Sequence, residues 1–273
     1  MNAQTVWNVW RRIMREPALQ QALLEERGED LSRFAFSEPE KQAALAYARD
    51  ASRAKWFVLN YRFRLANSFI NALETGAPLV LRALLRRGAD LRGLGERFLD
   101  MHGWKDYGPF VYGYCRDALE FLAQDDCTAQ PAGLRDLIGL EMTVVDLLRS
   151  LAAAPDAGAD ENTAFLRRTP LARHYRSRYR LSDWLRDKTL LGQGDLPAGV
   201  QDYLVYLTDY DSTYKFALLP PRAVEILQAL TSPCLPVELS SRLAASGAAP
   251  LVAADDKHLA LLKGCRAISG KLG

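Results

Sequence analysis

The chain has 273 residues, with 35 Lys and Arg against 33 Asp and Glu, and 49% of its residues are hydrophobic. This composition is typical of a folded protein of one large or two smaller domains. A net charge of +2 gives no general attraction to nucleic acid or to a membrane surface. We find no export signal and no apolar run near the roughly 20 residues of a membrane span. The four scattered cysteines, Cys115, Cys127, Cys234 and Cys265, predict free thiols and a cytoplasmic location.

The first half of the chain has the apolar spacing of helices. Ser37 and Glu40 form a capping-box signature, which marks the start of a helix. Apolar residues then recur at steps of three and four. This predicts an amphipathic helix from about Glu38 to Glu74, roughly 50 Å long, unless it breaks near Arg53. Shorter helices are expected at Pro78–Arg87, Leu91–Met101, Pro109–Ala123 and Leu134–Ala153.

The pattern changes after the segment Ala154–Asn162, which is small, acidic and without apolar period and predicts a linker. We expect a helical domain at residues 1–153, a linker at 154–165 and a second domain at 166–273. Strands are expected where residue types alternate, at His174–Leu181, Tyr203–Asp209 and Thr213–Leu218. Helices should follow at Pro220–Ala229, Pro236–Ala245 and Asp255–Ser269. The expected fold class is α+β, mostly α.

Three strands followed by three helices make a small winged-helix-type domain. The segments YLVYL, YKFALLPPRAVEILQAL and PVELSSRL resemble the precursor recognition element of RiPP systems, the PqqD-like domain of peptide-modifying complexes. The resemblance covers about residues 173–269. After its strand-to-helix corner, the pattern A-x-x-I-L-x-x-L is filled by Ala223, Ile226, Leu227 and Leu230. The resemblance implies a peptide bound between the third strand and the third helix.

Nearly the whole chain resembles the partner subunits of DUF692-type multinuclear iron oxidases, within which it is most similar to the MbnC-type subunits of methanobactin biosynthesis. The segments that carry this are VWRRIMREPALQQALL and FLDMHGWKDYGPFVYGYCRDALEFL. The resemblance implies a complex with an MbnB-like DUF692 iron oxidase subunit and an MbnA-like precursor peptide. That complex converts selected cysteines to an oxazolone and an adjacent thioamide, giving a copper-chelating peptide. This chain would dock the leader and support the iron subunit.

The resemblance also implies a peptide site. An extended peptide can add a strand to a free sheet edge, with alternate side chains entering pockets. The site would comprise Thr213, Tyr214, Lys215, Phe216, Ala217 and Leu218 on the strand and Lys257, His258, Leu261 and Cys265 on the helix. Lys215 and Lys257 would pair with acidic leader residues. Alternatively, Tyr214, Phe216 and Leu218 are core residues and the chain's own Arg176–Arg180 strand covers the edge.

Aromatic residues in the helical half suit an interface with the partner, because large aromatic side chains dominate interface energies. The expected interface residues are Trp7, Trp10, His102, Trp104, Tyr107, Phe110 and Tyr112. Aromatic residues at helical spacing are also typical of a core, so each could instead be buried. His102 could approach a metal held by the partner, or it could be an ordinary turn histidine.

The chain lacks recognisable catalytic motifs. Its histidines, His102, His174 and His258, are isolated and show no metal-ligand spacing. Asp209 and Asp211 flank a turn, where aspartates bond the nearby backbone. We therefore expect no catalytic residue, no metal site and no cofactor in this chain, with iron confined to the partner. The alternating Arg176, Arg178 and Arg180 could form a solvated basic face, attract an acidic partner surface or peptide, or contact nucleic acid.

Two other functions remain open. A winged helix could bind DNA as a transcription regulator, although the candidate recognition helix at Pro236–Ala245 has Arg242 as its only cation. The chain could also be an enzyme on its own, with a site that no motif reveals. Strongly salt-dependent DNA binding would support the regulator, and turnover by the isolated chain would support the enzyme.

Overall fold

The computed structural model is mostly helical with small antiparallel sheets, which confirms the expected α+β class. It describes residues 2–25, 31–103, 111–153, 164–209 and 213–270. Contacts divide the chain into two compact units, one comprising Met1–Ala72 and Asp90–Phe110 and the other Leu73–Ala89 and Val111–Gly273. None of the helices within the described ranges has the length and apolar character needed to cross a membrane.

The first unit contains α1 (Ala3–Arg15), α2 (Pro17–Leu24), α3 (Glu38–Arg49), most of α4 (Ala51–Gly76) and α6 (Leu91–His102). The predicted capping box is present, because Glu40 accepts from the backbone and the hydroxyl of Ser37 at 2.8 and 2.7 Å. The single long helix expected from Glu38 is instead two helices, with the break at Asp50, whose φ is −115° and ψ is 50°. Val9, Ile13, Leu19 and Ala44 are completely buried in this unit.

The second unit begins with helices that surround a buried carboxylate. These are α5 (Pro78–Arg86), α7 (Val111–Gln124) and α8 (Leu134–Ala153). Glu141 of α8 is fully buried, and its carboxylate accepts from the backbone N–H of Leu79 at 3.0 Å and of Val80 at 2.7 Å. It therefore satisfies donors in the first turn of α5, which no intrahelical carbonyl can reach.

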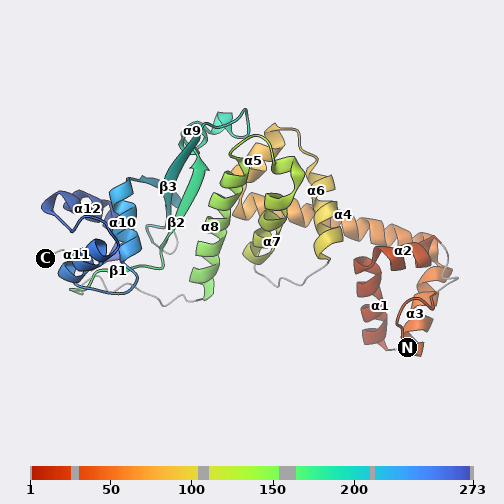
Figure 1. Ribbon diagram of the computed structural model, residues 1–273. Coiled ribbons are helices and arrows are strands. Elements are labelled where there is room, and N and C mark those ends of the chain that lie inside the picture. The colour runs from red at the N-terminus through yellow and green to blue at the C-terminus, as the bar shows by residue number, and fades with distance from the viewer. Residues whose placement is uncertain (1, 26–30, 104–110, 154–163, 210–212, 271–273) are drawn as a thin grey trace. The chain divides into compact units, whose positions relative to one another are not determined.

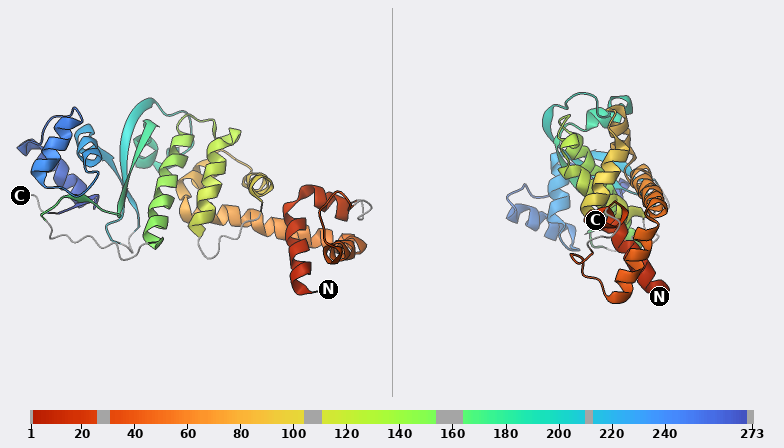
Figure 2. Two further views of the ribbon diagram at one scale, coloured as in Figure 1. Left: turned by 60° about the horizontal axis from the view of Figure 1, so that its bottom comes forward. Right: turned by 90° about the vertical axis from the view of Figure 1, so that its right-hand side faces the viewer.

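A three-stranded antiparallel sheet follows, in the order β2 (Ala172–Tyr179), β3 (Ala198–Tyr206) and β4 (Lys215–Leu219). The three predicted strands are thus present, although β3 begins five residues earlier than Tyr203. The short α9 (Ser182–Arg186) connects β2 towards β3. Figures 1 and 2 show the sheet between α8 on one face and α10 (Pro221–Ala229) on the other. A separate pair joins β1 (Arg167–Arg168) to β5 (Ile268–Ser269).

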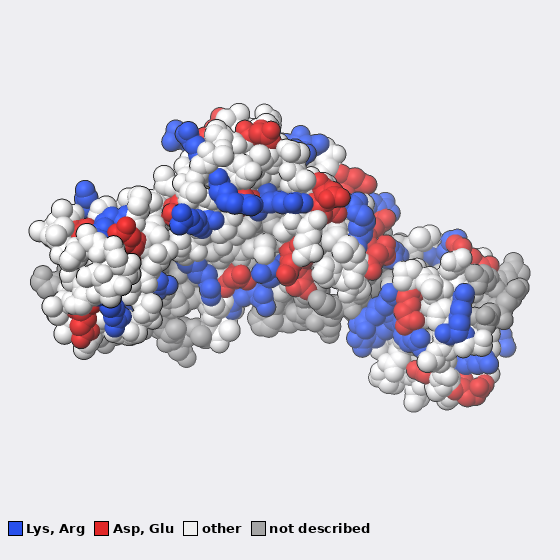
Figure 3. Space-filling model, viewed as in Figure 1, with Lys and Arg blue, Asp and Glu red and all other residues white. Residues whose placement is uncertain are grey.

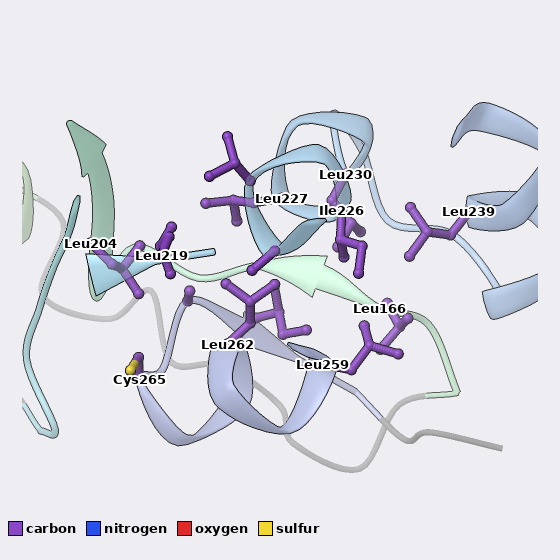
Figure 4. Packing of buried hydrophobic residues seen from close by; sticks show 14 of the residues in the cluster. Leu166, Leu204, Leu219, Ile226, Leu227, Leu230, Leu239, Leu259, Leu262 and Cys265 are labelled. Carbon is purple, nitrogen blue, oxygen red and sulfur yellow. The ribbon is translucent and has the colours of Figure 1, made fainter. Parts of the chain in front are cut away.

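The C-terminal helices pack a second core against this sheet. They are α10, α11 (Pro236–Ala245) and α12 (Asp256–Gly264). In Figure 4 the buried cluster joins leucines of the strands to apolar residues of all three helices. The cluster includes Leu204, Leu219, Ile226, Leu227, Leu239, Leu259 and Leu262. The expected third helix is shorter than Asp255–Ser269, because it ends at Gly264 and the chain then pairs as β5.

The units differ from the domains expected from the sequence. The contacts group α5, α7 and α8 with the sheet, and α8 packs directly on β2. Gly139 of α8 allows this close approach, because a Cβ there would lie 2.5 Å from the Tyr175 hydroxyl. Periodicity identifies helices but does not say what each one packs on. Most of the expected linker, residues 154–163, lies outside the described residues.

Candidate functional site at the edge strand β4

Strand β4 lies at one edge of the sheet and pairs with β3. In the described part of the chain, no other strand pairs with the outer side of β4. The alternative in which the Arg176–Arg180 strand covers this edge is wrong, because β2 pairs with β3 on the far side. An outer side of this kind presents backbone N–H and C=O groups that an added strand can bind.

The two faces of β4 have different surroundings. Ala217 and Leu219 point towards the C-terminal core, where Ala217 is aligned with Leu204 of β3. Phe216 and Leu218 lie on the opposite face, the one that carries Tyr175. The Tyr175 hydroxyl donates to the backbone carbonyl of Asp136 at 2.8 Å, so this face is directed at α8.

The aromatic face of β4 is only partly closed. Leu218 has 51% of its surface exposed, and Phe216 is half-buried. Tyr214 and Phe216 are in edge contact, with ring centroids 5.5 Å apart. The alternative in which these residues are plain core therefore does not hold for Leu218, which leaves an apolar side chain at the sheet edge.

Tyr214, just before β4, is half-buried and directed at the helices of its own unit. Burial raises the pKa of Tyr214, and the nearby Glu141, Cys115 and Tyr112 raise it further. These neighbours belong to α7 and α8. Tyr214 therefore anchors the start of β4, whereas Phe216 and Leu218 are the side chains better placed to contact a bound peptide.

Residues of α12 flank the sheet on the core side. Lys257 is exposed, His258 is half-buried, and Leu261 packs against the C-terminal core. Cys265 is buried and shares a hydrogen bond with Tyr206, the β3 residue aligned with Lys215. Burial raises the pKa of the Cys265 thiol, so it is no ready nucleophile. The end of α12 and the start of β4 thus meet around Tyr206.

An ion pair fixes the beginning of α12 against α10. Arg222 binds Asp255 through two bonds, from Nε to Oδ1 at 3.0 Å and from Nη2 to Oδ2 at 2.8 Å. It also donates to the backbone carbonyl of Pro250 at 3.0 Å. The hydrogen bond from Arg222 lowers the pKa of Asp255 to about 2. This bidentate pair gives α12 a defined position beside the sheet.

The predicted basic residues at the end of β2 are exposed. Arg176, Arg178 and Arg180 alternate with the buried Ser177 and the half-buried Tyr179, and the register with β3 shifts between Ser177 and Tyr179. Arg178 then binds Asp136 of α8, from its backbone N–H at 2.7 Å and its guanidinium at 3.1 Å. His174 pairs with Asp202 at 2.7 Å. The expected solvated basic face is therefore present, with the guanidinium of Arg178 76% exposed and that of Arg180 53% exposed even though each is near an acid.

The predicted interface residues fall in both units. Trp7 is 45% exposed, and Trp10 contacts Tyr47 with ring centroids 5.6 Å apart. A cavity of about 600 Å³ in the first unit is lined by apolar and aromatic residues, namely Ala3, Val6, Trp7, Trp10, Tyr47, Phe57 and Tyr61. His102 stacks on Phe98 at 4.8 Å, and Tyr112 is half-buried in the second unit. Trp104, Tyr107 and Phe110 lie outside the described residues.

Sequence reasoning missed the buried acids Asp136 and Glu141. The signal for Glu141 was present, because it falls on the apolar face of its helix between Leu137 and Val145. Within the described ranges, no three His, Cys, Asp or Glu side chains cluster in a way that could hold a metal ion.

No family model and no curated protein matches the chain. The functional assignment therefore depends on the residues and geometry of the β4 edge.

Proposed function

We propose that this chain is a non-catalytic peptide-recognition subunit, which binds the leader of a precursor peptide by strand addition at β4. The observation that carries the proposal is the outer side of β4, which no strand of the described chain occupies. Main-chain hydrogen bonds would supply affinity, and contacts with Phe216 and Leu218 would supply specificity.

The order of elements supports the proposal. Three antiparallel strands lead through Pro220 into α10, and α11 and α12 follow. This is the order implied by the resemblance to the PqqD-like, winged-helix recognition element. The peptide would lie along β4 with α12 as its flank, so Lys215 and Lys257 could pair with acidic leader residues. Each exposed pair would contribute about 0–1 kcal/mol.

The remaining steps follow from the resemblance to MbnC-type subunits. The partner is an MbnB-like DUF692 oxidase subunit that holds multinuclear iron, and the precursor is MbnA-like. The iron subunit converts cysteines to oxazolone and thioamide groups, which gives copper-chelating methanobactin. This chain contributes no catalytic group and no metal ligand of its own.

The first unit offers a surface for the iron subunit. Exposed apolar side chains gather on α1 and α4, where Trp7, Trp56 and Phe57 are 45%, 59% and 50% exposed. Large aromatic residues beside an apolar cavity are typical of interface hot spots. We expect Trp56→Ser and Phe57→Ser together to weaken copurification with the iron subunit.

Peptide binding tests the central claim. The probe is a synthetic leader of a short cysteine-bearing precursor, taken from the reading frames beside a DUF692-type protein, and its affinity is measured by fluorescence anisotropy on the assembled complex. We expect Leu218→Asp to weaken binding at least about tenfold, because it places a charge at the apolar edge. Val237→Asp is the matched control, since Val237 is an exposed apolar residue of α11.

The outcome that counts against the proposal is equal leader affinity in the two variants. Leu218 is exposed, so its substitution should leave the fold intact. Circular dichroism and thermal unfolding check this directly. Copurification with the iron subunit separates a loss of peptide binding from a loss of assembly.

DNA binding has less support. The candidate recognition helix α11 has Arg242 as its cation, and this residue donates to the backbone carbonyl of Ser232 at 2.9 Å. Positive and negative side chains are interspersed over the face shown in Figure 3. A groove-reading surface normally gathers several cations along one element.

A further inference from the structure

A second hollow lies at the opposite edge of the sheet, beside the first residues of β2. It has a volume of about 680 Å³, within the range of small-molecule sites. Its walls come from α8 on one side and from the segment between Arg168 and His174 on the other. All of them belong to the second unit, and none is among the residues proposed to bind the leader.

The floor of this cavity is apolar. Leu204, Leu227 and Ala267 line it and are themselves almost fully buried, at 1%, 5% and 2% exposure. They are part of the C-terminal core, so the floor is held by packing from several elements. An apolar group that enters the cavity would therefore be removed from water against a preformed surface.

The rim carries two guanidinium groups with N–H donors that no acceptor in the described part of the chain occupies. Arg168 donates through Nε and Nη2 to the backbone carbonyl of Leu227, which leaves its Nη1 available. The exposed side chain of Arg173, on the edge strand β2, makes no hydrogen bond or ion pair with the described part of the chain. Arginine remains protonated at any physiological pH, so both groups keep their charge.

The acidic groups at the same rim are already paired. Asp146 accepts from Nε of Arg116 at 3.1 Å, and Arg149 approaches it at 4.0 Å. His174 holds Asp202 by a hydrogen bond of 2.7 Å, and Asp202 itself does not line the cavity. The uncompensated charge facing the cavity is therefore positive, and it comes from Arg168 and Arg173.

We infer that this cavity binds an amphipathic carboxylate, a small molecule with an apolar body and one carboxylate head. The body would cover the floor formed by Leu204 and Leu227, and the head would accept from the guanidinium groups of Arg168 and Arg173. A planar guanidinium fork matches a carboxylate in geometry and charge. One free guanidinium and part of a second suit a monoanion better than a dianionic phosphate.

The test compares two probes with the same carbon skeleton, 4-phenylbutyrate and its uncharged amide, titrated calorimetrically into the full-length chain. We expect the carboxylate to bind with a Kd of about 1 mM or tighter and the amide at least about tenfold more weakly. Methyl NMR spectra should show shifts of Leu204 and Leu227 on binding. Inorganic phosphate should bind more weakly than the carboxylate.

Two variants on one strand locate the site. Arg173→Gln should weaken carboxylate binding by at least about tenfold, since it removes a charge-assisted contact. Arg176→Gln is the matched control, because Arg176 is exposed on β2 but does not line the cavity. The inference would be overturned if acid and amide bound equally, or if both variants bound the acid equally. It would also be overturned if the signals of Leu204 and Leu227 did not shift, or if the acid did not bind at about 10 mM. Neither variant should change leader affinity, so this result stands apart from the proposed function.

Discussion

The two edges of the three-stranded sheet are protected in different ways. The β2 edge carries Arg173 and Arg176 and is bent by the register shift at Ser177. The β4 edge is short, and it presents Leu218 with half of its surface exposed. Charged side chains and bulges are the usual means by which proteins keep an edge from pairing. We therefore expect β4, rather than β2, to be the edge that accepts an added strand.

Both edges depend on α8. Asp136 near its beginning binds β2 where its register with β3 shifts, accepting from the Ser177 hydroxyl at 3.2 Å and from Arg178. Glu141, five residues later, lies near Tyr214, which leads into β4. One helix thus bonds β2 through the buried Asp136 and bonds α5 through the buried Glu141, which lies near the residue that leads into β4.

The largest effect on stability should come from removing the contact between Asp136 of α8 and the edge strand β2. Asp136→Ala removes a buried carboxylate and leaves the Arg178 backbone N–H without its acceptor, whereas the Ser177 hydroxyl keeps the carbonyl of Tyr179 at 2.8 Å. We expect a loss of about 3–5 kcal/mol in the free energy of unfolding, measured by urea titration. Arg178→Gln is the control and should cost less than about 1 kcal/mol, because that side chain is 76% exposed. Equal losses would mean that Asp136 is not what holds this part of β2.

The buried carboxyl group of Glu141 should make the stability of the protein depend on pH. Burial raises the pKa of Glu141 to about 8, from 4.5 in an unfolded chain. The folded state therefore binds the proton of Glu141 more tightly than the unfolded state does. The stability gained from this proton is fully present below pH 4.5 and is lost as the pH rises through about 8. In the wild type the free energy of unfolding should fall by about 2–4 kcal/mol between these two pH values. In Glu141→Gln this fall should be absent.

Urea titrations at a series of pH values measure this difference. Glu120→Gln is the matched control on α7, because its side chain is 54% exposed. The control should keep the pH dependence of the wild type. A Glu141→Gln variant with the same dependence would show that another group is responsible.

The ion pair between Arg222 and Asp255, which holds α12 beside the sheet, should have a smaller effect on stability. Arg222→Gln removes the bidentate partner of Asp255 and should cost about 1–3 kcal/mol. The pKa of Asp255 is lowered to about 2 from 3.8, so the ion pair with Arg222 stabilises the folded protein fully above pH 3.8. This stabilisation is lost as the pH falls through about 2. The gap between wild type and variant should therefore narrow in acid. A constant gap would indicate that Arg222 acts through packing alone.

Local sequence signals predicted the elements better than their partners. The capping box at Ser37 and the Pro-rich corner at Pro220 mark helix starts that the structure contains. The break at Asp50 has no Gly or Pro to mark it, and the apolar period continues past it. The strand β3 begins at Ala198 and Gly199, which are poor strand formers, so its extension depends on pairing with β2.

The candidate site was predictable in part. Alternation in Thr213–Leu218 correctly placed Phe216 and Leu218 on one face, because that follows from strand geometry alone. The direction of Tyr214 towards Glu141 and Cys115 was not predictable, since it depends on helices far away in sequence. The pairing of Arg178 with Asp136 was missed for a related reason, because the two residues are 42 positions apart in sequence.

The spacing of Asp136 and Glu141 has a consequence for how this protein can change over evolution. Five residues of α-helix rotate a side chain by about 140°, which is why one acid reaches the sheet while the other reaches α5. Inserting or deleting a single residue between them would turn one acid by a further 100° or so and bury it without donors. Homologues should therefore vary freely in loop lengths yet keep the interval between these two acids constant.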